Sequence, residues 1–285
     1  MSLAHLRVLL TGATGGIGRA TARELSARGA AVLLTGRDRE ALEQLARELD
    51  PDGDRHGVMP ADLTDACERD RLAALAIDWR GGINALVNNA GVGDLRLFLH
   101  ESPEQIDRAI AVNVTAPMQL CRALLPQLVR LSEAHLLNVG SVFGAIGYPG
   151  YATYCAGKFA LRGFTEALAR EADGTPLRVH YLAPRATATA MNGAAANQMN
   201  DELGVATDPP ERVAVAVCEM LEGSRRRAVI GWPEKLFARL NGALPGVVDA
   251  ALRKQLPVIL RFAASGRQRP AAANPIVQNP RSSLS

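Results

Sequence analysis

This sequence contains few of the residues that mark metal-binding or disulfide-stabilised proteins. Its four cysteines are scattered and form no CxxC pair, and none of its five histidines has ligand spacing with another. We therefore expect no metal site. Free thiols are typical of a reducing compartment. The cysteines are Cys67, Cys121, Cys155 and Cys218.

Signals for membranes and nucleic acids are also missing. The N-terminus MSLAHLRVLLTG lacks the long apolar core and cleavage site of a signal peptide. No stretch reaches the ~18 consecutive apolar residues of a membrane span. The net charge is only +3, and no basic stripe with interleaved aromatic residues is present. The three arginines at 225–227 are more typical of a solvated turn. We expect a cytoplasmic protein that does not bind nucleic acid.

Short apolar runs alternate with longer helical patterns along the chain. The runs show little polar alternation, which is typical of parallel strands covered on both faces. They are 6–12, 30–36, 56–62, 83–89, 134–141, 177–184 and 227–232. The helical stretches are Arg19–Arg28, Asp38–Leu49, Ala66–Trp79, Pro103–Leu131, Tyr151–Ala172 and Pro209–Glu222. The order predicts an α/β fold: a Rossmann-like, doubly wound parallel sheet of about seven strands flanked by helices. Residues 1–265 are expected to form one domain.

The last part of the chain departs from this alternation. Residues 234–265 form an amphipathic extension, which Pro245 and Pro257 are expected to divide into short helices. Two interpretations stay open: the helices cover the sheet edge or the substrate pocket, or they rest on a membrane surface, since basic residues flank the apolar face. Residues 266–285 are rich in Pro, Arg, Ala and Ser, and we expect them to be disordered.

A glycine-rich turn, TGATGGIG at 11–18, follows the first apolar run and precedes a helical stretch. Residues without Cβ let the backbone approach a pyrophosphate, and the helix N-terminus offers free N–H groups. Within a βαβ unit, such a turn indicates a dinucleotide site.

The end of the second apolar run indicates which dinucleotide binds. An acidic residue there would bond a ribose 2′-hydroxyl, but this run ends in Gly36 followed by Arg37. A guanidinium suits a 2′-phosphate. Asp38 is an alternative reader of the ribose, although it is also a good N-cap for the next helix. We therefore expect NADP(H) rather than NAD(H).

Taken together, these motifs resemble those of the short-chain dehydrogenase/reductase family, in its compact single-domain branch. The matching segments are TGATGGIG at 11–18, ADL at 61–63, NNAG at 88–91, AVNVT at 111–115, NVGS at 138–141 and YCAGK at 154–158. They occur in the order and at the spacings of that family, over roughly the first two-thirds of the chain.

The resemblance implies a catalytic tetrad and a set of cofactor-binding positions. The tetrad would be Asn113, Ser141, Tyr154 and Lys158. The cofactor would lie against Thr11, Gly12, Thr14, Gly15, Gly16, Ile17, Gly18, Arg37, Asp62, Leu63, Asn89, Ala90, Gly91, Tyr154, Lys158, Pro184, Thr187 and Thr189. The family also builds homodimers or homotetramers, through the helices that correspond to 103–131 and 151–172.

One segment departs from the family's pattern. After the sixth strand the family usually has Pro-Gly, whereas here Pro184 is followed by Arg185. Arg185 either faces the pocket and favours an anionic substrate, or lies on the surface of a slightly altered turn. Thr187 or Thr189 remains available to contact the nicotinamide.

The spacing of Tyr154 and Lys158 fits an acid–base device, because residues four apart share one face of a helix. A nearby ammonium favours the phenolate, so we expect Lys158 to lower the pKa of Tyr154 toward the working pH. Ser141, at the end of the fifth strand, would donate to the substrate oxygen. Asn113 is expected to bond a buried backbone group, and the resemblance implies that it holds a water that passes protons to Lys158; the two roles are compatible.

These residues predict an NADP(H)-dependent oxidoreductase that transfers hydride between nicotinamide and a ketone, an aldehyde or a secondary alcohol. The alternatives are a non-catalytic NADP(H)-binding regulatory protein and a membrane-surface reductase of a lipid-like carbonyl. Residues 186–207 are expected to form a lid, with Met191 and Met199 as adaptable apolar contacts. The absence of aromatic and charged anchors in that lid favours a hydrophobic or acyl-chain substrate.

Overall fold

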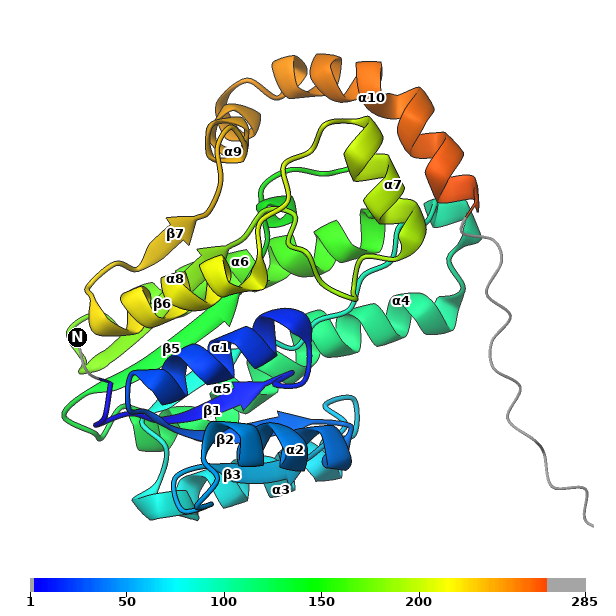
Figure 1. Cartoon of the computed structure of the whole chain (residues 1–285). Coiled ribbons are helices and arrows are strands. Elements are labelled where there is room, and N and C mark those ends of the chain that lie inside the picture. Colours follow the sequence, from blue (N-terminus) through cyan, green and yellow to red (C-terminus); the bar gives the residue numbers. More distant parts are fainter. Residues whose placement is uncertain (1–2, 266–285) are drawn as a thin grey trace, which may run out of the picture.

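The structure, a computed structural model, describes residues 3–265 and contains one seven-stranded parallel sheet (Figure 1). The strand order is β3-β2-β1-β4-β5-β6-β7, so the doubly wound fold predicted from the sequence is confirmed. Each predicted strand is present. The strands are β1 (Arg7–Thr11), β2 (Ala31–Gly36), β3 (Gly57–Pro60), β4 (Ala85–Asn88), β5 (Ala134–Val139), β6 (Leu177–Ala183) and β7 (Arg227–Val229).

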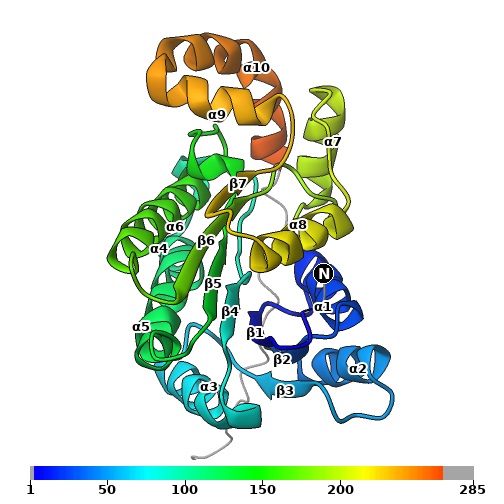
Figure 2. The same ribbon diagram turned by 90° about the vertical axis from the view of Figure 1, so that its left-hand side faces the viewer.

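Helices cover both faces of the sheet (Figure 2). Helices α1, α2 and α8 lie on one face, and α3, α5 and α6 lie on the other, with α4 leading into α5. The helices are α1 (Gly16–Ala27), α2 (Arg39–Leu49), α3 (Ala66–Asp78), α4 (Pro103–Ile110), α5 (Ala116–Leu128), α6 (Ala152–Glu171), α7 (Ala194–Glu202), α8 (Pro210–Glu222), α9 (Glu234–Ala243) and α10 (Pro245–Ser265).

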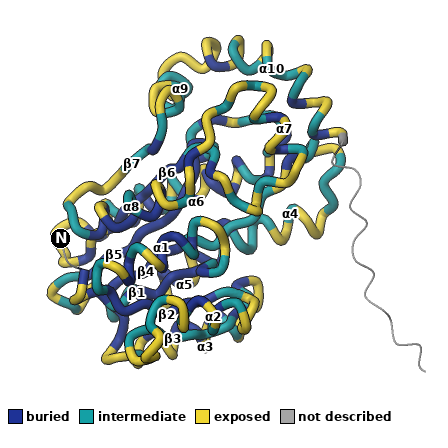
Figure 3. Tube along the Cα trace, viewed as in Figure 1, coloured by how far each residue is buried: buried dark blue, intermediate teal, exposed yellow. Residues whose placement is uncertain are grey.

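The apolar runs of the central strands, β1, β2, β4, β5 and β6, are continuous because both faces of these strands are buried, whereas the edge strands β3 and β7 are only partly covered. In β1, Val8 and Leu10 pack toward α1 and α8, whereas Leu9 packs toward α3 and α5. Side chains alternate between the faces of a strand, so a strand buried on both sides has no polar face. The central strands accordingly form the dark-blue centre of the molecule in Figure 3.

The predicted helix 103–131 is wrong as a single element. It is divided by a π-helical turn, Ala111–Thr115, which separates α4 from α5. Pro117 has no N–H to donate to the carbonyl of Asn113, so the regular α-helical ladder fails at this point. The turn places Asn113 in the interior, where it is only 1% exposed.

The C-terminal extension differs from the prediction in one respect. Pro245 begins α10 and separates it from α9 as expected, but Pro257 lies inside a continuous α10. Beyond Pro257, Ile259 and Ala263 are buried against α7 and Leu95, and this packing offsets the hydrogen bond that the proline removes. Within residues 3–265, no helix is long and apolar enough to cross a membrane. The predicted disorder of 266–285 lies outside the described residues.

Candidate active site

A cavity of about 640 Å³ opens at the carboxyl ends of the strands. It lies where the strand order reverses, because β1 is followed by β2 on one side and is paired with β4 on the other. Ligands of open α/β sheets bind at this position. The cavity runs from the glycine-rich turn to helices α9 and α10, so the C-terminal helices line the pocket, as the first of the two interpretations held.

The glycine-rich turn is packed too closely for side chains. Gly12 has a φ of +64°, and a Cβ there would lie 2.8 Å from the Cα of Ala90. A Cβ on Gly18 would lie 2.0 Å from the carbonyl oxygen of Gly12. Gly15 precedes α1 without a side-chain cap. The first N–H groups of α1 are therefore available to an anionic group at the cavity.

Thr11 and Asn89 hold this turn from behind. The hydroxyl of Thr11 accepts hydrogen bonds from the backbone N–H groups of Asn89 and Ala90, at 2.9 and 3.0 Å. The Asn89 side-chain amide donates to the carbonyls of Thr11 and Gly12, at 3.0 and 3.2 Å. The ends of β1 and β4 are thereby fixed to each other, and the floor of the cavity is pre-formed.

The far end of the cavity, beside the carboxyl end of β2, is basic. Arg37 is exposed and lines the cavity, as does Arg108 of α4. The carboxylate of Asp38 accepts from the N–H of Ala41 at 3.0 Å and caps α2, so the capping interpretation of Asp38 is confirmed. The pKa of Asp62 is lowered, first by the N–H of Thr64 and also by the charges of the two arginines.

Ser141, Tyr154 and Lys158 meet at the other end of the cavity. The Ser141 hydroxyl accepts from the N–H of Phe143 at 3.1 Å, and it lies close enough to the phenol of Tyr154 to lower the pKa of that group. Lys158 is 4% exposed, and its Nζ donates to the carbonyl of Val139 at 3.0 Å and lies 5.7 Å from the centre of the Tyr154 ring. Helix α6 therefore presents both side chains to the end of β5, as their spacing predicts.

The predicted effect of Lys158 on the pKa of Tyr154 is not found. Burial raises the pKa of Tyr154 to about 12, and only the hydrogen bond with Ser141 opposes this rise appreciably. Burial also lowers the pKa of Lys158 to about 8. The ammonium lies over the ring and donates to Val139, so desolvation outweighs its attraction for the phenolate. Tyr154 is a neutral phenol at neutral pH.

Asn113 does not itself line the cavity, but it holds the backbone of Val92, which does. Its Oδ1 accepts from the N–H of Val92 at 3.0 Å, and its Nδ2 donates to the carbonyl of Val92 at 2.8 Å. Asn113 therefore bonds a backbone group as expected, and that group belongs to the partly buried Val92 of the cavity wall. A Cβ on Gly91 would lie 3.1 Å from Oδ1 of Asn113 and 3.5 Å from Nζ of Lys158, so both polar atoms lie next to Gly91.

Aromatic residues surround the reactive phenol, and sequence reasoning missed them. Phe143 stacks on Tyr148 with ring centres 4.8 Å apart, and it meets Tyr154 edge-on at 6.3 Å. Tyr151 also meets Tyr154 edge-on, at 6.2 Å. The hydroxyl of Tyr148 donates to Gln255 of α10 at 3.5 Å. The spacing of the three tyrosines near the start of α6 was the signal that could have revealed this wall.

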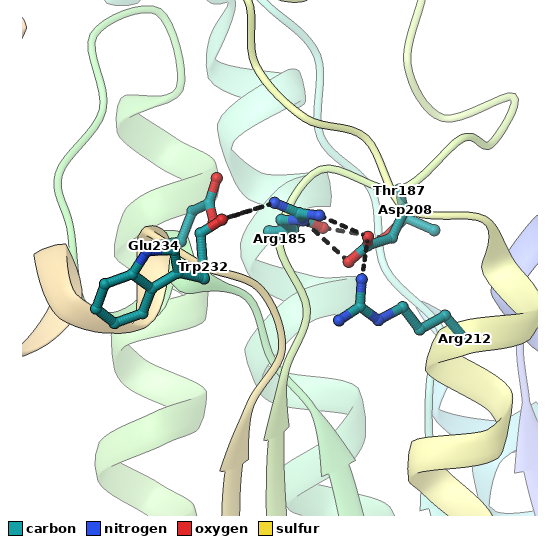
Figure 4. Close-up of polar contacts among 6 residues, drawn as sticks. All are labelled: Arg185, Thr187, Asp208, Arg212, Trp232 and Glu234. Carbon is teal, nitrogen blue, oxygen red and sulfur yellow. Dashed lines mark hydrogen bonds and ion pairs between the residues drawn. The ribbon is translucent and has the colours of Figure 1, made fainter.

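Arg185 does not present a free charge to the pocket. Its guanidinium forms two hydrogen bonds with Asp208, at 3.0 and 2.8 Å, and a third with the carbonyl of Trp232 at 3.1 Å (Figure 4). It also contacts Glu234 at 3.4 Å. Arg185 is therefore not free to pair with an anionic substrate, so the alternative that it favours such a substrate is not supported. The surface alternative is also wrong, because the Arg185 side chain is only 11% exposed.

Most of the predicted site residues lie on one surface. All the predicted catalytic and cofactor-binding residues line the cavity except Thr11 and Asn113, which support it through the bonds given above. Residues that line it without having been predicted include Val92, Gly93, Arg108, Phe143, Ile146, Tyr148, Tyr151, Phe237, Leu252 and Gln255.

A doubly wound sheet, a glycine cradle and a Ser-Tyr-Lys group in one cavity together define a dinucleotide-dependent oxidoreductase. The chain belongs to the short-chain dehydrogenase family, whose model matches residues 7–200. It acts on the CH–OH/C=O couple, with a nicotinamide dinucleotide as its redox partner.

Known proteins agree with this assignment. Nodulation protein G of Rhizobium meliloti (strain 1021) is 40% identical over 200 residues, which cover 70% of this chain and 80% of that protein. A short-chain dehydrogenase from Sphingobium yanoikuyae in complex with NADPH superposes with a TM-score of 0.73 at 26% identity, covering 86% of this chain and 95% of that one. A 3-ketoacyl-(acyl-carrier-protein) reductase from Brucella melitensis complexed with NADH gives 0.71 at 28% identity, covering 79% and 95%.

Proposed function

We propose that this protein is an NADP(H)-dependent reductase of ketones or aldehydes, with Tyr154 as general acid. The carrying observation is that Ser141, Tyr154 and Lys158 meet in the same cavity as the glycine cradle, with Nζ of Lys158 5.7 Å from the centre of the Tyr154 ring. The reverse reaction, oxidation of a secondary alcohol, uses the same groups with Tyr154 as base.

The chain's own groups perform the proton chemistry. Bound NADPH supplies a hydride to the carbonyl carbon. Ser141 donates a hydrogen bond to the carbonyl oxygen, which stabilises the negative charge that develops there. Tyr154 transfers its phenolic proton to that oxygen. Lys158 holds the ribose beside the phenol, and Asn113 keeps the segment at Val92 in place and supports a proton path to Lys158.

The pKa of Tyr154 supports the direction of reduction. A group with a pKa of about 12 is protonated throughout the neutral range, so the phenol carries the proton that reduction requires. Oxidation needs the phenolate, which becomes populated only as the pH rises toward that value. The positive charge of an oxidised nicotinamide would help to form it.

Arg37 supports the preference for NADP(H). It lies at the end of β2, beside the adenosine end of the cavity, and Asp38 is occupied as the cap of α2. The exposed Arg108 adds a second positive charge near Asp62. Two guanidinium groups favour a 2′-phosphate over a 2′-hydroxyl.

The walls of the cavity support an uncharged, largely apolar substrate. Beyond Ser141 the cavity is lined by aromatic residues of 143–151 and by Met191, Met199, Phe237 and Leu252. The one arginine among the residues that line this end, Arg185, is paired with carboxylates. An acyl chain that carries a keto group fits this lining, and one similar solved structure is a 3-ketoacyl reductase.

A panel of carbonyl compounds tests the proposal, with NADPH oxidation followed by absorbance. We expect ketones with longer alkyl chains to be reduced at higher kcat/KM than short or anionic ones. The absence of turnover across the panel, together with tight NADPH binding, would instead favour the non-catalytic regulatory alternative.

The outer surface of the C-terminal helices favours a second candidate, a reductase at a membrane surface. Leu236, Leu244, Val247 and Leu260 are between 41% and 58% exposed, and they lie among Lys235, Arg239, Arg253 and Lys254. Basic amphipathic surfaces bind anionic lipid. Flotation with phosphatidylserine vesicles tests this role, and equal flotation of the wild-type chain and a Leu244→Asp/Val247→Asp variant would remove it.

A homodimer or homotetramer is also part of the proposal. Apolar side chains are exposed on and beside the α4–α6 layer: Phe98 is 60% exposed, Leu99 87%, Met118 39% and Phe159 43%. A second copy of the chain would cover them. Light scattering after size-exclusion chromatography tests this, and a monomer at micromolar concentration would contradict it.

A further inference from the structure

Arg185 joins three separate segments of the chain. It lies two residues after the end of β6, it binds Asp208 directly after the segment 186–207, and it reaches Trp232, just before α9, and Glu234, the first residue of α9 (Figure 4). The Asp208 side chain is only 4% exposed. Its carboxylate is also bound by Arg212 of α8, at 2.9 Å. A polar cluster of this kind, next to an apolar cavity, fixes the relative positions of the segments that it joins.

The backbone around Arg185 is adapted to this side chain. Gly231 has a φ of +104°, and a Cβ there would lie 2.5 Å from Cδ of Arg185. Any other residue at 231 would displace the arginine and would also be strained at this φ. The Nε and Nη2 atoms of Arg185 donate to the Asp208 carboxylate, and its Nη1 donates to the Trp232 carbonyl near the start of α9. A lysine has no planar fork and could not make these contacts together.

Asp208 closes the base of the segment 186–207, here called the lid. Its N–H donates to the carbonyl of Ala186, and its carbonyl accepts from the N–H of Ala188, both at 2.9 Å. These bonds form a parallel bridge between Thr187 and Asp208. The carbonyl of Arg185 accepts from the Thr187 hydroxyl at 3.0 Å. The two residues of the ion pair are thus also the two ends of the lid.

Both ends of the cavity depend on the segments that Arg185 joins. Thr189 of the lid lies against the glycine-rich turn, where a Cβ on Gly16 would be 2.6 Å from its Cγ2. Met199 of the lid is buried among residues that include Ile259 of α10. Phe237 of α9 lines the same cavity. The lid therefore borders the cofactor end, and α9 borders the substrate end.

We propose that Arg185 is a positioning residue that couples the lid to α9, so that the cofactor and substrate ends of the cavity are held in one arrangement. This inference rests on the proposed function only for its kinetic part. Its structural part is a property of the ligand-free chain.

Hydrogen–deuterium exchange of the ligand-free protein tests the coupling. Asp208→Asn removes the charge that anchors Arg185 at the lid, and Asp208 itself is bonded to no residue of α9. We expect exchange to accelerate about tenfold in peptides from 186–207 and also in peptides from 234–243. Arg185→Gln should do the same, and Glu234→Gln should accelerate mainly the α9 peptides. Helix α2 serves as the internal reference.

The exposed ion pair between Arg226 and Asp173 supplies matched controls, because its side chains are 57% and 68% exposed. Arg226→Gln and Asp173→Asn make the same chemical changes as the test variants, and they should leave the exchange of lid and α9 unchanged. Arg212 still pairs with Asp208 when Arg185 is replaced, so the Arg185→Gln variant leaves the buried carboxylate of Asp208 paired, and only Glu234, whose side chain is 20% exposed, loses its ion pair with Arg185.

Kinetics gives a second measurement. Glu234→Gln should raise KM for an apolar ketone by about fivefold and leave the NADPH dissociation constant unchanged, whereas Asp208→Asn should raise both. Arg185→Lys should not restore the wild-type values. The coupling is wrong if Asp208→Asn affects the lid peptides alone, or if Arg185→Gln exchanges like the controls. If the wild type reduces no carbonyl, the proposed function fails, while the exchange experiment still decides the coupling.

Discussion

Gly93 lies directly against the ring of Tyr154: a Cβ at position 93 would be 2.5 Å from Cδ2 of that ring. The backbone at 92–93 therefore forms the surface on which the phenol rests. Asn113 fixes this backbone through its two hydrogen bonds to Val92. The orientation of the proposed acid thus depends on a residue without a side chain and on an asparagine in a π-helical turn.

Replacing that glycine should disturb the phenol more than the fold. We expect Gly93→Ala to reduce kcat by about tenfold or more, because misplacing a reacting group by about 1 Å has a large effect on rate. The NADPH dissociation constant and Tm should change little. Gly147→Ala is the control, since a Cβ there meets no atom within 4 Å. Equal kcat values for the two variants would contradict this role of Gly93.

The proposed acid is tested by Tyr154→Phe, which removes only the hydroxyl. Turnover should fall by about 10²–10⁴-fold, the usual contribution of general acid catalysis. NADPH binding, measured by fluorescence titration, should be retained because the ring and its aromatic contacts remain. If the variant keeps most of its turnover, Tyr154 is not the proton donor.

Arg37 should determine the cofactor preference. Arg37→Ala removes a charge-assisted contact to a 2′-phosphate, so the NADPH dissociation constant should rise by about tenfold or more. The NADH dissociation constant should be nearly unchanged. Arg39→Ala is the control, because that exposed arginine contacts Glu43 on its own helix. An undiminished preference for NADPH in the Arg37 variant would defeat the argument.

Lys158 should make the folded protein less stable at neutral pH. Its pKa of about 8 lies below the ordinary value of 10.5, which means that the buried ammonium raises the free energy of the folded state. The shift corresponds to about 3 kcal/mol, and the lost bond to Val139 offsets about 1 kcal/mol. Lys158→Met should therefore stabilise the protein by about 2 kcal/mol at pH 7 while abolishing turnover.

The pH dependence has a definite sign. Below pH 8 both the folded and unfolded states carry the protonated lysine, and the full penalty is present. As the pH rises from about 8 to 10.5, only the folded state has lost its proton, so the advantage of Lys158→Met should shrink. Urea unfolding of both proteins at pH 7 and pH 10 measures this difference. A constant difference would show that Lys158 is not strained by its burial.

The strands of the sheet are well predicted because each of them can be recognised from its own residues. Runs such as 30–36 are apolar on both faces, and only a covered parallel strand accounts for that pattern. The glycine-rich turn could also be predicted from the local sequence, because Gly12 lies so close to Ala90 that no side chain fits at position 12. The four-residue spacing of Tyr154 and Lys158 likewise follows from helix geometry alone.

What the sequence could not predict depends on contacts between distant segments. The π-helical turn at Asn113 and the continuity of α10 through Pro257 are set by packing, which overrides the local propensity. The pKa of Tyr154 was predicted in the wrong direction because spacing reports proximity to Lys158 and says nothing about burial. The partners of Arg185 lie 23 and 49 residues away along the chain, beyond any local pattern.

By packing against α7, helix α10 covers apolar side chains and so helps to keep the protein soluble. Ile259 and Ala263 cover Leu95, Ala196 and Met199, which are all at least nine-tenths buried. A protein truncated before Pro245 would expose these side chains to water as one adjoining apolar patch. Such a shortened protein should aggregate on concentration, even though its sheet and its glycine-rich turn would remain intact.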